Sequence, residues 1–149
     1  MSDKTENKTL DHWDKNVRQF SLRGRIRSFT YAIRGVILML KSQHNAWLHA
    51  VASILVLFLG CFFGLSDPEW CSLVLAIMAV WTAEALNTAL EFLADVASPE
   101  FHPLVEKAKD VAAGAVLISA VGSVMIALLV LGPHAYNFLS DILHPLPMQ

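Results

Sequence analysis

The chain has 149 residues, of which 55% are hydrophobic and 16% are charged, and its formal net charge is −2. This composition is typical of an integral membrane protein. It excludes an ordinary soluble domain, because the apolar runs described below are too long for the buried helices of such a short chain.

The N-terminal part of the chain is polar and of mixed charge. Residues 1–24 are predicted to form a mobile cytoplasmic tail, and they lack the apolar run and cleavage site of a signal peptide. Residues 25–43 carry basic side chains, such as Arg25, Arg27 and Arg34, with apolar residues between them. This pattern predicts an amphipathic helix on the cytoplasmic membrane surface, although an ordinary helix packed on the membrane domain fits it equally well.

Several segments are long and apolar enough to cross a membrane, which takes about 20 helical residues. They lie at about residues 47–65, 70–95 and 110–132. The chain is therefore predicted to be an all-α integral membrane protein with three transmembrane helices and an N-terminal amphipathic surface helix, within one membrane domain at residues 25–132. Residues 133–149 are expected to form an extracytoplasmic tail.

The distribution of Lys and Arg predicts the orientation. These residues are frequent before the first span and recur at Lys107 and Lys109, between the second and third spans. The connection after the first span and the chain after residue 132 contain neither. By the positive-inside rule, the N-terminus and residues 96–110 are cytoplasmic. We therefore expect a multi-pass membrane protein whose N-terminus is cytoplasmic.

The second predicted span ends in a polar stripe. At about 100° per residue, Glu84, Asn87, Glu91 and Asp95 fall on one face of a helix. An ionised carboxylate within the bilayer costs several kcal/mol by most scales, so such a stripe indicates a function. Measured from Cys71 at about 1.5 Å per residue, Glu84 lies about 20 Å deep and Glu91 about 30 Å. Acids at two depths suit transfer between an aqueous donor and a lipid acceptor, and a proton or ion pathway fits them comparably well.

Lys109 stands at the start of the third predicted span, near the level of Glu91. A lysine there can act as a point charge on phosphate, and the alternative is a positive-inside anchor. The chain contains neither GxxxxGK[ST] nor GxGxxG, so a nucleotide site would have to be built on a helical membrane scaffold. A small non-catalytic subunit, whose stripe pairs with the cations of a partner, is a further hypothesis. No nucleic-acid partner is expected.

Several sequence blocks form a specific combination. The main blocks are Glu84-Ala-Leu-Asn87-Thr-Ala-Leu-Glu91 and Ala108-Lys109-Asp110, and further ones are Asp95, Glu100-Phe-His102, Tyr31-Ala-Ile-Arg34-Gly35 and Asn45-Ala-Trp-Leu-His49. In this combination the chain resembles the family of prokaryotic diacylglycerol kinases and undecaprenol kinases, over roughly residues 28–131. The resemblance favours a lipid kinase over an ion-conducting or non-catalytic membrane trimer.

The resemblance implies a homotrimer of small membrane subunits that phosphorylates a membrane lipid alcohol with ATP and Mg²⁺. It implies that Glu84 is the general base for the lipid hydroxyl, that Asn87 supports the site and that Glu91 binds Mg²⁺. It also implies that Lys109 neutralises phosphate charge. The other family positions implied in nucleotide or substrate binding are Asp95, Glu100, Asp110, Tyr31 and Arg34.

Gln43 departs from the family pattern, which usually has a glutamate there as a second magnesium ligand. No Asp or Glu between Lys15 and Ser66 can replace it. Magnesium sites in ATP enzymes often use one or two carboxylates plus phosphates and water, so Glu91 with the nucleotide can suffice, and Gln43 would be a weaker, neutral ligand. The sequence does not decide whether the acceptor lipid is undecaprenol or diacylglycerol. The sequence motif around His102 favours undecaprenol.

Overall fold

The computed structural model describes residues 21–144 of the chain. Most of the tail predicted at residues 1–24, and the last five residues of the tail predicted at 133–149, lie outside this range. The described chain divides into two units, one ending at Ile37 and one beginning at Leu38, and each is described here by itself.

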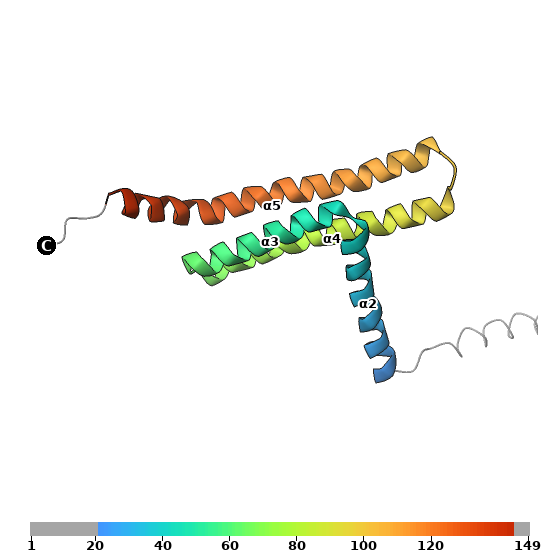
Figure 1. The fold of residues 1–149 in the computed structure, drawn as a ribbon, viewed down its shortest axis with the longest axis horizontal. Coiled ribbons are helices and arrows are strands. Elements are labelled where there is room, and N and C mark those ends of the chain that lie inside the picture. Colours follow the sequence, from blue (N-terminus) through green and yellow to red (C-terminus); the bar gives the residue numbers. More distant parts are fainter. Residues whose placement is uncertain (1–20, 145–149) are drawn as a thin grey trace, which may run out of the picture. The chain divides into compact units, whose positions relative to one another are not determined.

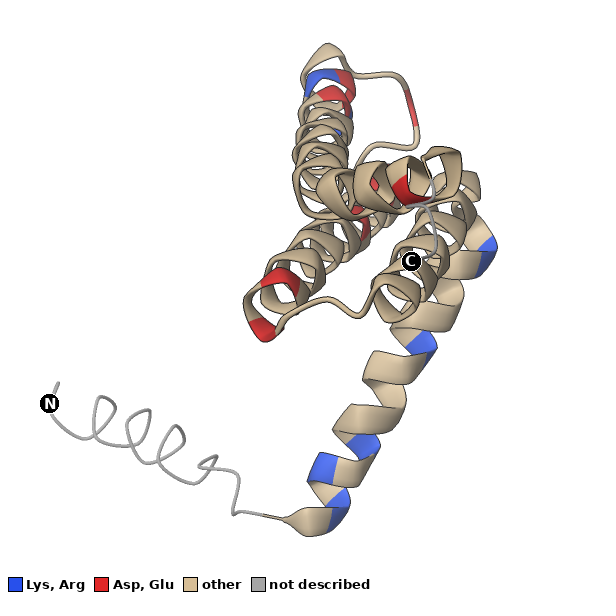
Figure 2. Ribbon diagram, turned by 90° about the vertical axis from the view of Figure 1, so that its left-hand side faces the viewer, with Lys and Arg blue, Asp and Glu red and all other residues tan. Residues whose placement is uncertain are grey.

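Helix α2 (Leu22–Ser42) supplies nearly all of the described part of the first unit, and its residues from Leu38 onward belong to the second. It contains no acidic residue, and Figure 2 shows Lys and Arg spaced along it. The guanidinium carbons of Arg27 and Arg34 lie 5.9 and 6.0 Å from the centre of the Tyr31 ring, which are cation–π distances. Its large apolar side chains are mostly exposed, as an interfacial helix requires.

The second unit contains α3 (His44–Phe63), α4 (Asp67–Ala97) and α5 (Pro103–Leu143). Each is long and apolar enough to cross a membrane. They lie side by side, and α4 and α5 form a long antiparallel hairpin (Figure 1). The predicted fold class, an all-α membrane protein with three spans and a preceding helix, is confirmed over the described residues.

The turn between α3 and α4 is set by local chemistry. Gly64 ends α3 in the left-handed conformation (φ +67°), which glycine adopts without strain, and its N–H donates to the carbonyl of Gly60. The N–H and hydroxyl of Ser66 donate to one carboxylate oxygen of Glu69, at 2.8 and 2.6 Å, and Pro68 lies in the first turn of α4. Because a helix-ending glycine and a helix-starting capping box lie within a few residues of each other, the chain reverses direction here.

The other connection, at residues 98–102, joins α4 to α5. The hydroxyl of Ser98 donates to the carbonyl of Glu100 at 2.9 Å. His102 caps α5, since its Nδ1 accepts the N–H of Leu104 at 3.2 Å. This turn brings the end of α4 against the start of α5, where much of the predicted site lies.

A few polar contacts tie the three helices together within an otherwise apolar interface. Trp81 of α4 donates through its indole nitrogen to the hydroxyl of Ser53 on α3, at 3.1 Å. The hydroxyl of Ser123 on α5 donates to the carbonyl of Ala76 on α4, at 2.9 Å. These bonds fix the register of the bundle near its middle.

The end of the bundle beside the α3–α4 turn is apolar and partly aromatic. Leu65, Leu73 and Leu131 are buried there, and the ring of His134 lies 2.8 Å from a carboxylate oxygen of Glu69 and stacks on Phe63. Through these two contacts of His134, α5 is connected to both α3 and α4.

Helix α5 is longer than the predicted span, which ended at residue 132. It has 41 residues and continues through Pro133 to Leu143. A proline removes one backbone hydrogen bond, and neighbouring helices and local adjustments tolerate this in membrane helices. The contacts of His134 with Glu69 and Phe63, which no local sequence pattern reveals, hold this extension against the bundle.

Candidate functional site

The polar stripe of α4 runs from a buried to an exposed environment. Glu84, Asn87 and Thr88 are 1%, 7% and 4% exposed, and they are the buried polar residues of the described chain. Glu91, one turn further, is half-buried, and Asp95 is exposed. Burial within the protein therefore decreases along the stripe from Glu84 to Asp95.

The carboxylate of Glu91 is held by two amides. Gln43 donates through Nε2 to Glu91 Oε2, and Asn87 donates through Nδ2 to Glu91 Oε1 at 3.1 Å. Gln43 precedes the first residue of α3, so the start of this helix places its side chain against α4. Both oxygens of Glu91 accept from neutral groups, which fixes the carboxylate in orientation while keeping its charge available.

The carboxylate of Glu84 is less satisfied. Its Oε1 is buried with no hydrogen-bond partner among the described residues, and the same holds for Asn87 Oδ1. The hydroxyl of Thr88 donates to the backbone carbonyl of Glu84, at 2.8 Å, and so leaves the carboxylate alone. A buried polar atom without a partner costs about 1–3 kcal/mol, so this pair of oxygens indicates a place for a ligand that supplies donors.

The titratable groups close enough to act electrostatically on Glu84 are His49 and Glu91. His49 comes from α3, and Glu91 lies two turns further along α4. Both groups therefore influence Glu84 electrostatically, one from α3 and one from α4 itself.

Lys109 does not stand free at the mouth of the bundle. Its Nζ lies 3.0 Å from Asp95 Oδ1, and both side chains are substantially exposed, at 40% and 66%. Such a surface ion pair contributes about 1 kcal/mol or less, so an incoming phosphate can take the place of Asp95 at little cost.

A hollow of about 370 Å³ lies beside this ion pair, between the ends of α4 and α5 and their connection. The charged side chains that line it are Asp95, Glu100, Glu106, Lys109 and Asp110. Acids outnumber the single lysine, so the hollow repels a bare triphosphate and suits one whose charge is offset by a metal ion. It brings together the predicted residues Asp95, Glu100, Lys109 and Asp110.

The residues present fit a magnesium ion only in part. The described residues contain no cluster of three or more His, Cys, Asp or Glu side chains able to hold a metal. Glu91 offers one carboxylate, and Gln43 directs its nitrogen, not its oxygen, at that carboxylate. This donor set matches a metal that is held by one carboxylate together with phosphates and water.

The structure brings the predicted residues together in two groups of the second unit. Gln43, Glu84, Asn87 and Glu91 form the first, and Asp95, Glu100, Lys109 and Asp110 form the second. Tyr31 and Arg34 lie on α2 in the other unit, where they contact each other.

Sequence reasoning assigned no role to Thr88 and His49. Thr88 is buried and bonded to the backbone of Glu84, and His49 is a charged or polar neighbour close enough to influence Glu84 electrostatically. One signal was available for His49, which is a polar residue within an apolar span and ends one of the blocks that carry the resemblance. Thr88 also lies within one of these blocks, but its residue type alone indicated nothing, because a threonine in an apolar helix commonly bonds its own backbone.

Comparisons with known proteins identify a family and several relatives. A family model described as prokaryotic diacylglycerol kinase matches residues 30–131, which is more than half of the chain. Undecaprenol kinase of Bacillus subtilis (strain 168) is 40% identical over 107 residues, which cover 72% of this chain and 87% of that protein. Diacylglycerol kinase of Synechocystis sp. is 35% identical over 100 residues, covering 66% and 57%. Diacylglycerol kinase of Escherichia coli (strain K12) is 28% identical over 113 residues, covering 71% and 93%.

Proposed function

Because the chain belongs to the prokaryotic diacylglycerol kinase family and is a lipid kinase, we propose that it transfers the γ-phosphate of ATP to the hydroxyl of a membrane lipid alcohol. We place this reaction at the cytoplasmic face of a bacterial inner membrane, with the N-terminus on the same side. The acceptor is undecaprenol or diacylglycerol. Undecaprenol is favoured, because the relative named undecaprenol kinase shares 40% identity with this chain.

The observation that carries the proposal is the buried, unpartnered Oε1 of Glu84 beside the held carboxylate of Glu91. The oxygen of the lipid hydroxyl forms a bond to the γ-phosphorus, while the bond from this phosphorus to the β–γ bridging oxygen breaks and ADP leaves. Glu84 accepts the hydroxyl proton, which it later passes to water. An unsatisfied carboxylate oxygen at the membrane boundary is suited to this, since the hydroxyl is the donor that it lacks.

Phosphoryl transfer depends mostly on positioning and charge neutralisation, and the other residues supply these. Gln43 and Asn87 hold the carboxylate of Glu91, which would bind the metal ion of the nucleotide. Bound Mg²⁺ would offset phosphate charge between Glu91 and the nucleotide. Lys109 would exchange Asp95 for a phosphate oxygen, and the released Asp95, with Glu100 and Asp110, would line the nucleotide hollow. Tyr31 and Arg34 are proposed to contribute from α2.

The functional unit is proposed to be a homotrimer. Large apolar side chains along α3, α4 and α5 are exposed in the single chain, as lipid contact and subunit contact both require. A site that encloses both a nucleotide and a lipid headgroup gains cover from neighbouring subunits.

Transfer of label from γ-labelled ATP tests the proposal. Purified protein in detergent micelles is supplied with undecaprenol or with 1,2-diacylglycerol, with and without Mg²⁺, and the lipid phosphate is separated and counted. We expect label in at least one lipid, dependent on Mg²⁺ and abolished in Glu84→Gln. Acid-dependent ion flux in vesicles without lipid phosphate would support the ion-conducting alternative instead.

A further inference from the structure

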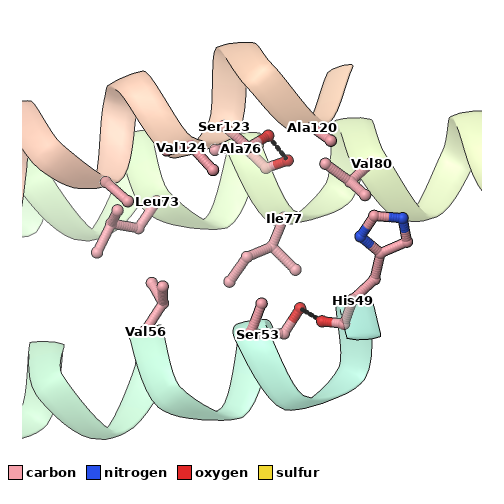
Figure 3. A pocket seen from close by; sticks show the side chains of 12 residues that line it. His49, Ser53, Val56, Leu73, Ala76, Ile77, Val80, Ala120, Ser123 and Val124 are labelled. Atoms are coloured by element: carbon pink, nitrogen blue, oxygen red, sulfur yellow. Dashed lines mark hydrogen bonds between the residues drawn. The ribbon is translucent and has the colours of Figure 1, made fainter. Parts of the chain in front are cut away.

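A cavity of about 120 Å³ lies inside the bundle of α3, α4 and α5, and the chemistry above does not use it. Figure 3 shows it with His49 and Val80 at one end, Ile77 in the middle, and Leu73 and Val56 at the other end. The two ends are about two helical turns apart on α3, which corresponds to about 10 Å.

One end of this cavity lies about one helical turn along α4 from the proposed base. Val80 precedes Glu84 by about one turn on the same face of α4, and both side chains are buried. The imidazole of His49 lies at the same end of the cavity (Figure 3). A lipid hydroxyl that donates to the unpartnered oxygen of Glu84 would therefore have its first carbons at the mouth of the cavity.

The walls offer almost no free hydrogen-bond donor. Their polar side chains are His49, Ser53 and Ser123. The Ser53 hydroxyl already donates to the carbonyl of His49, at 2.7 Å, and accepts from the indole of Trp81. The Ser123 hydroxyl donates to the carbonyl of Ala76. An ester carbonyl placed in the cavity would lose its hydrogen bonds to water and regain few, whereas a hydrocarbon loses none.

The size of the cavity matches a short piece of hydrocarbon. An apolar cavity of about 150 Å³ accepts one benzene molecule, so this one has room for about five carbon atoms. One isoprene unit has that number of carbons.

We propose that the cavity binds the hydrocarbon attached directly to the acceptor hydroxyl, and that it makes polyprenols better acceptors than diacylglycerols. This inference rests on the proposed function and specifies its substrate. In a polyprenol the hydroxyl carbon bears a single apolar, methyl-branched chain. In a diacylglycerol the corresponding carbon is followed by carbons that bear esters, for which the serine hydroxyls of the walls provide no free donor.

Filling the cavity tests this. Ala120 of α5 lines it and is half-buried, so Ala120→Leu occupies its volume. Ala113→Leu is the matched control, because it makes the same change on an exposed position of the same helix outside the cavity. We expect Ala120→Leu to lower kcat/KM for a micelle-embedded polyprenol by about tenfold or more. The KM for ATP should stay unchanged, and the control should behave like the parent protein.

Ile77→Ala supplies the opposite change, since Ile77 projects into the middle of the cavity. Enlarging the cavity should raise the rate with diacylglycerol relative to the rate with polyprenol. If Ala120→Leu does not fold, the measurement on Ile77→Ala is the test of the proposal. Unchanged acceptor preference in both variants would overturn the proposal while leaving the kinase function intact. A change of oligomeric state in Ala120→Leu, seen by crosslinking, would mean that a neighbouring subunit fills the space and would also overturn it. Failure of the parent protein to phosphorylate either lipid would remove the proposed function itself.

Discussion

Glu84 and Glu91 lie on one face of α4 but have different surroundings. Glu84 is buried with a free oxygen, and Glu91 is half-buried with both oxygens bound by amides. We predict that Glu84→Gln lowers lipid phosphorylation by about 100-fold to 10,000-fold, because it removes a proton acceptor while keeping size and shape. Nucleotide binding, measured by titration with a fluorescent ATP analogue, should be retained.

Glu91→Gln is the matched comparison, since it makes the same chemical change two turns further along α4. It should raise the concentrations of Mg²⁺ and ATP needed for half-maximal rate, because it removes the carboxylate proposed to face the metal. Equal loss of nucleotide binding in the two variants would contradict the division of roles.

Gln43, which departs from the family pattern, changes the surroundings of Glu91. Its amide donates to Glu91, so a glutamate at this position would bring two carboxylates together. We predict that Gln43→Glu lowers the thermal stability of the metal-free protein through charge repulsion and lowers the Mg²⁺ concentration needed for half-maximal activity. Gln43→Ala should do less harm than Glu91→Ala, because the phosphates supply most of the ligands of the metal.

Unfolding temperatures with and without Mg²⁺, together with magnesium titration of lipid phosphorylation, check this second prediction. His44→Glu serves as the control, because it adds the same charge at the adjacent, exposed position. If Gln43→Glu and His44→Glu respond alike to Mg²⁺, Gln43 does not act at the metal.

At the scale of the elements, α3 and α4 pack closely because α3 has a glycine where they meet. A Cβ atom built on Gly60 would lie 2.7 Å from the ring of Trp70 on α4, whereas one on Gly122 of α5 would meet nothing within 4 Å. Alanine in place of glycine favours a helix by about 1 kcal/mol, and overpacking costs about 1–3 kcal/mol. We predict that Gly60→Ala is less stable than Gly122→Ala by about 1–3 kcal/mol.

Reversible unfolding in mixed micelles, followed by circular dichroism, measures the two stabilities. Equal stabilities would show that the Trp70 ring moves aside without cost. A Gly60→Ala variant more stable than Gly122→Ala would contradict the packing argument.

The helices were predictable because hydropathy and length act locally along the chain. Hydropathy identified the spans of α3, α4 and α5, and the 3.6-residue period identified the stripe at Glu84. The end of α5 was not predictable, because it depends on His134 meeting Glu69 across 65 positions of the sequence.

The site was predictable in its residue types more than in its contacts. The spacing on α4 placed Glu84 and Glu91 on one face, and the resemblance implied their roles. The bond from Gln43 to Glu91, the pairing of Lys109 with Asp95 and the cavity beside His49 depend on how separate helices pack. Periodicity within one helix carries no information on such contacts.

At the scale of the whole molecule, the orientation in the membrane remains a prediction from charge. Asn137 on α5 and Pro99 in the α4–α5 connection are exposed and lie on opposite sides of the predicted membrane. After replacement of the two native cysteines, Cys61 and Cys71, by serine, a membrane-impermeant thiol reagent should label Asn137→Cys in intact cells but not Pro99→Cys. Labelling of Pro99→Cys alone would reverse the assignment, and lysed cells should label both.

Assembly is tested by mixing defective subunits. If each proposed site draws Glu84 and Lys109 from different chains, co-reconstituting Glu84→Gln with Lys109→Ala subunits should restore part of the activity, because some sites then contain both native residues. If one chain supplies both residues, no site in the mixture is complete unless native subunits are present. Absence of rescue, with crosslinking that shows mixed oligomers, would argue for sites within single chains.

The length of α5 also fixes a distance. Its 41 residues extend about 60 Å at about 1.5 Å per residue, whereas the hydrocarbon and headgroup layers together measure about 40–45 Å. Some 15–20 Å of helix must therefore stand clear of the bilayer unless it tilts strongly. This excess length is shared between the two ends of α5, so both Pro103 and Leu143 are expected to lie outside the lipid layers, and a fluorescent label at either end should be accessible to a water-soluble quencher.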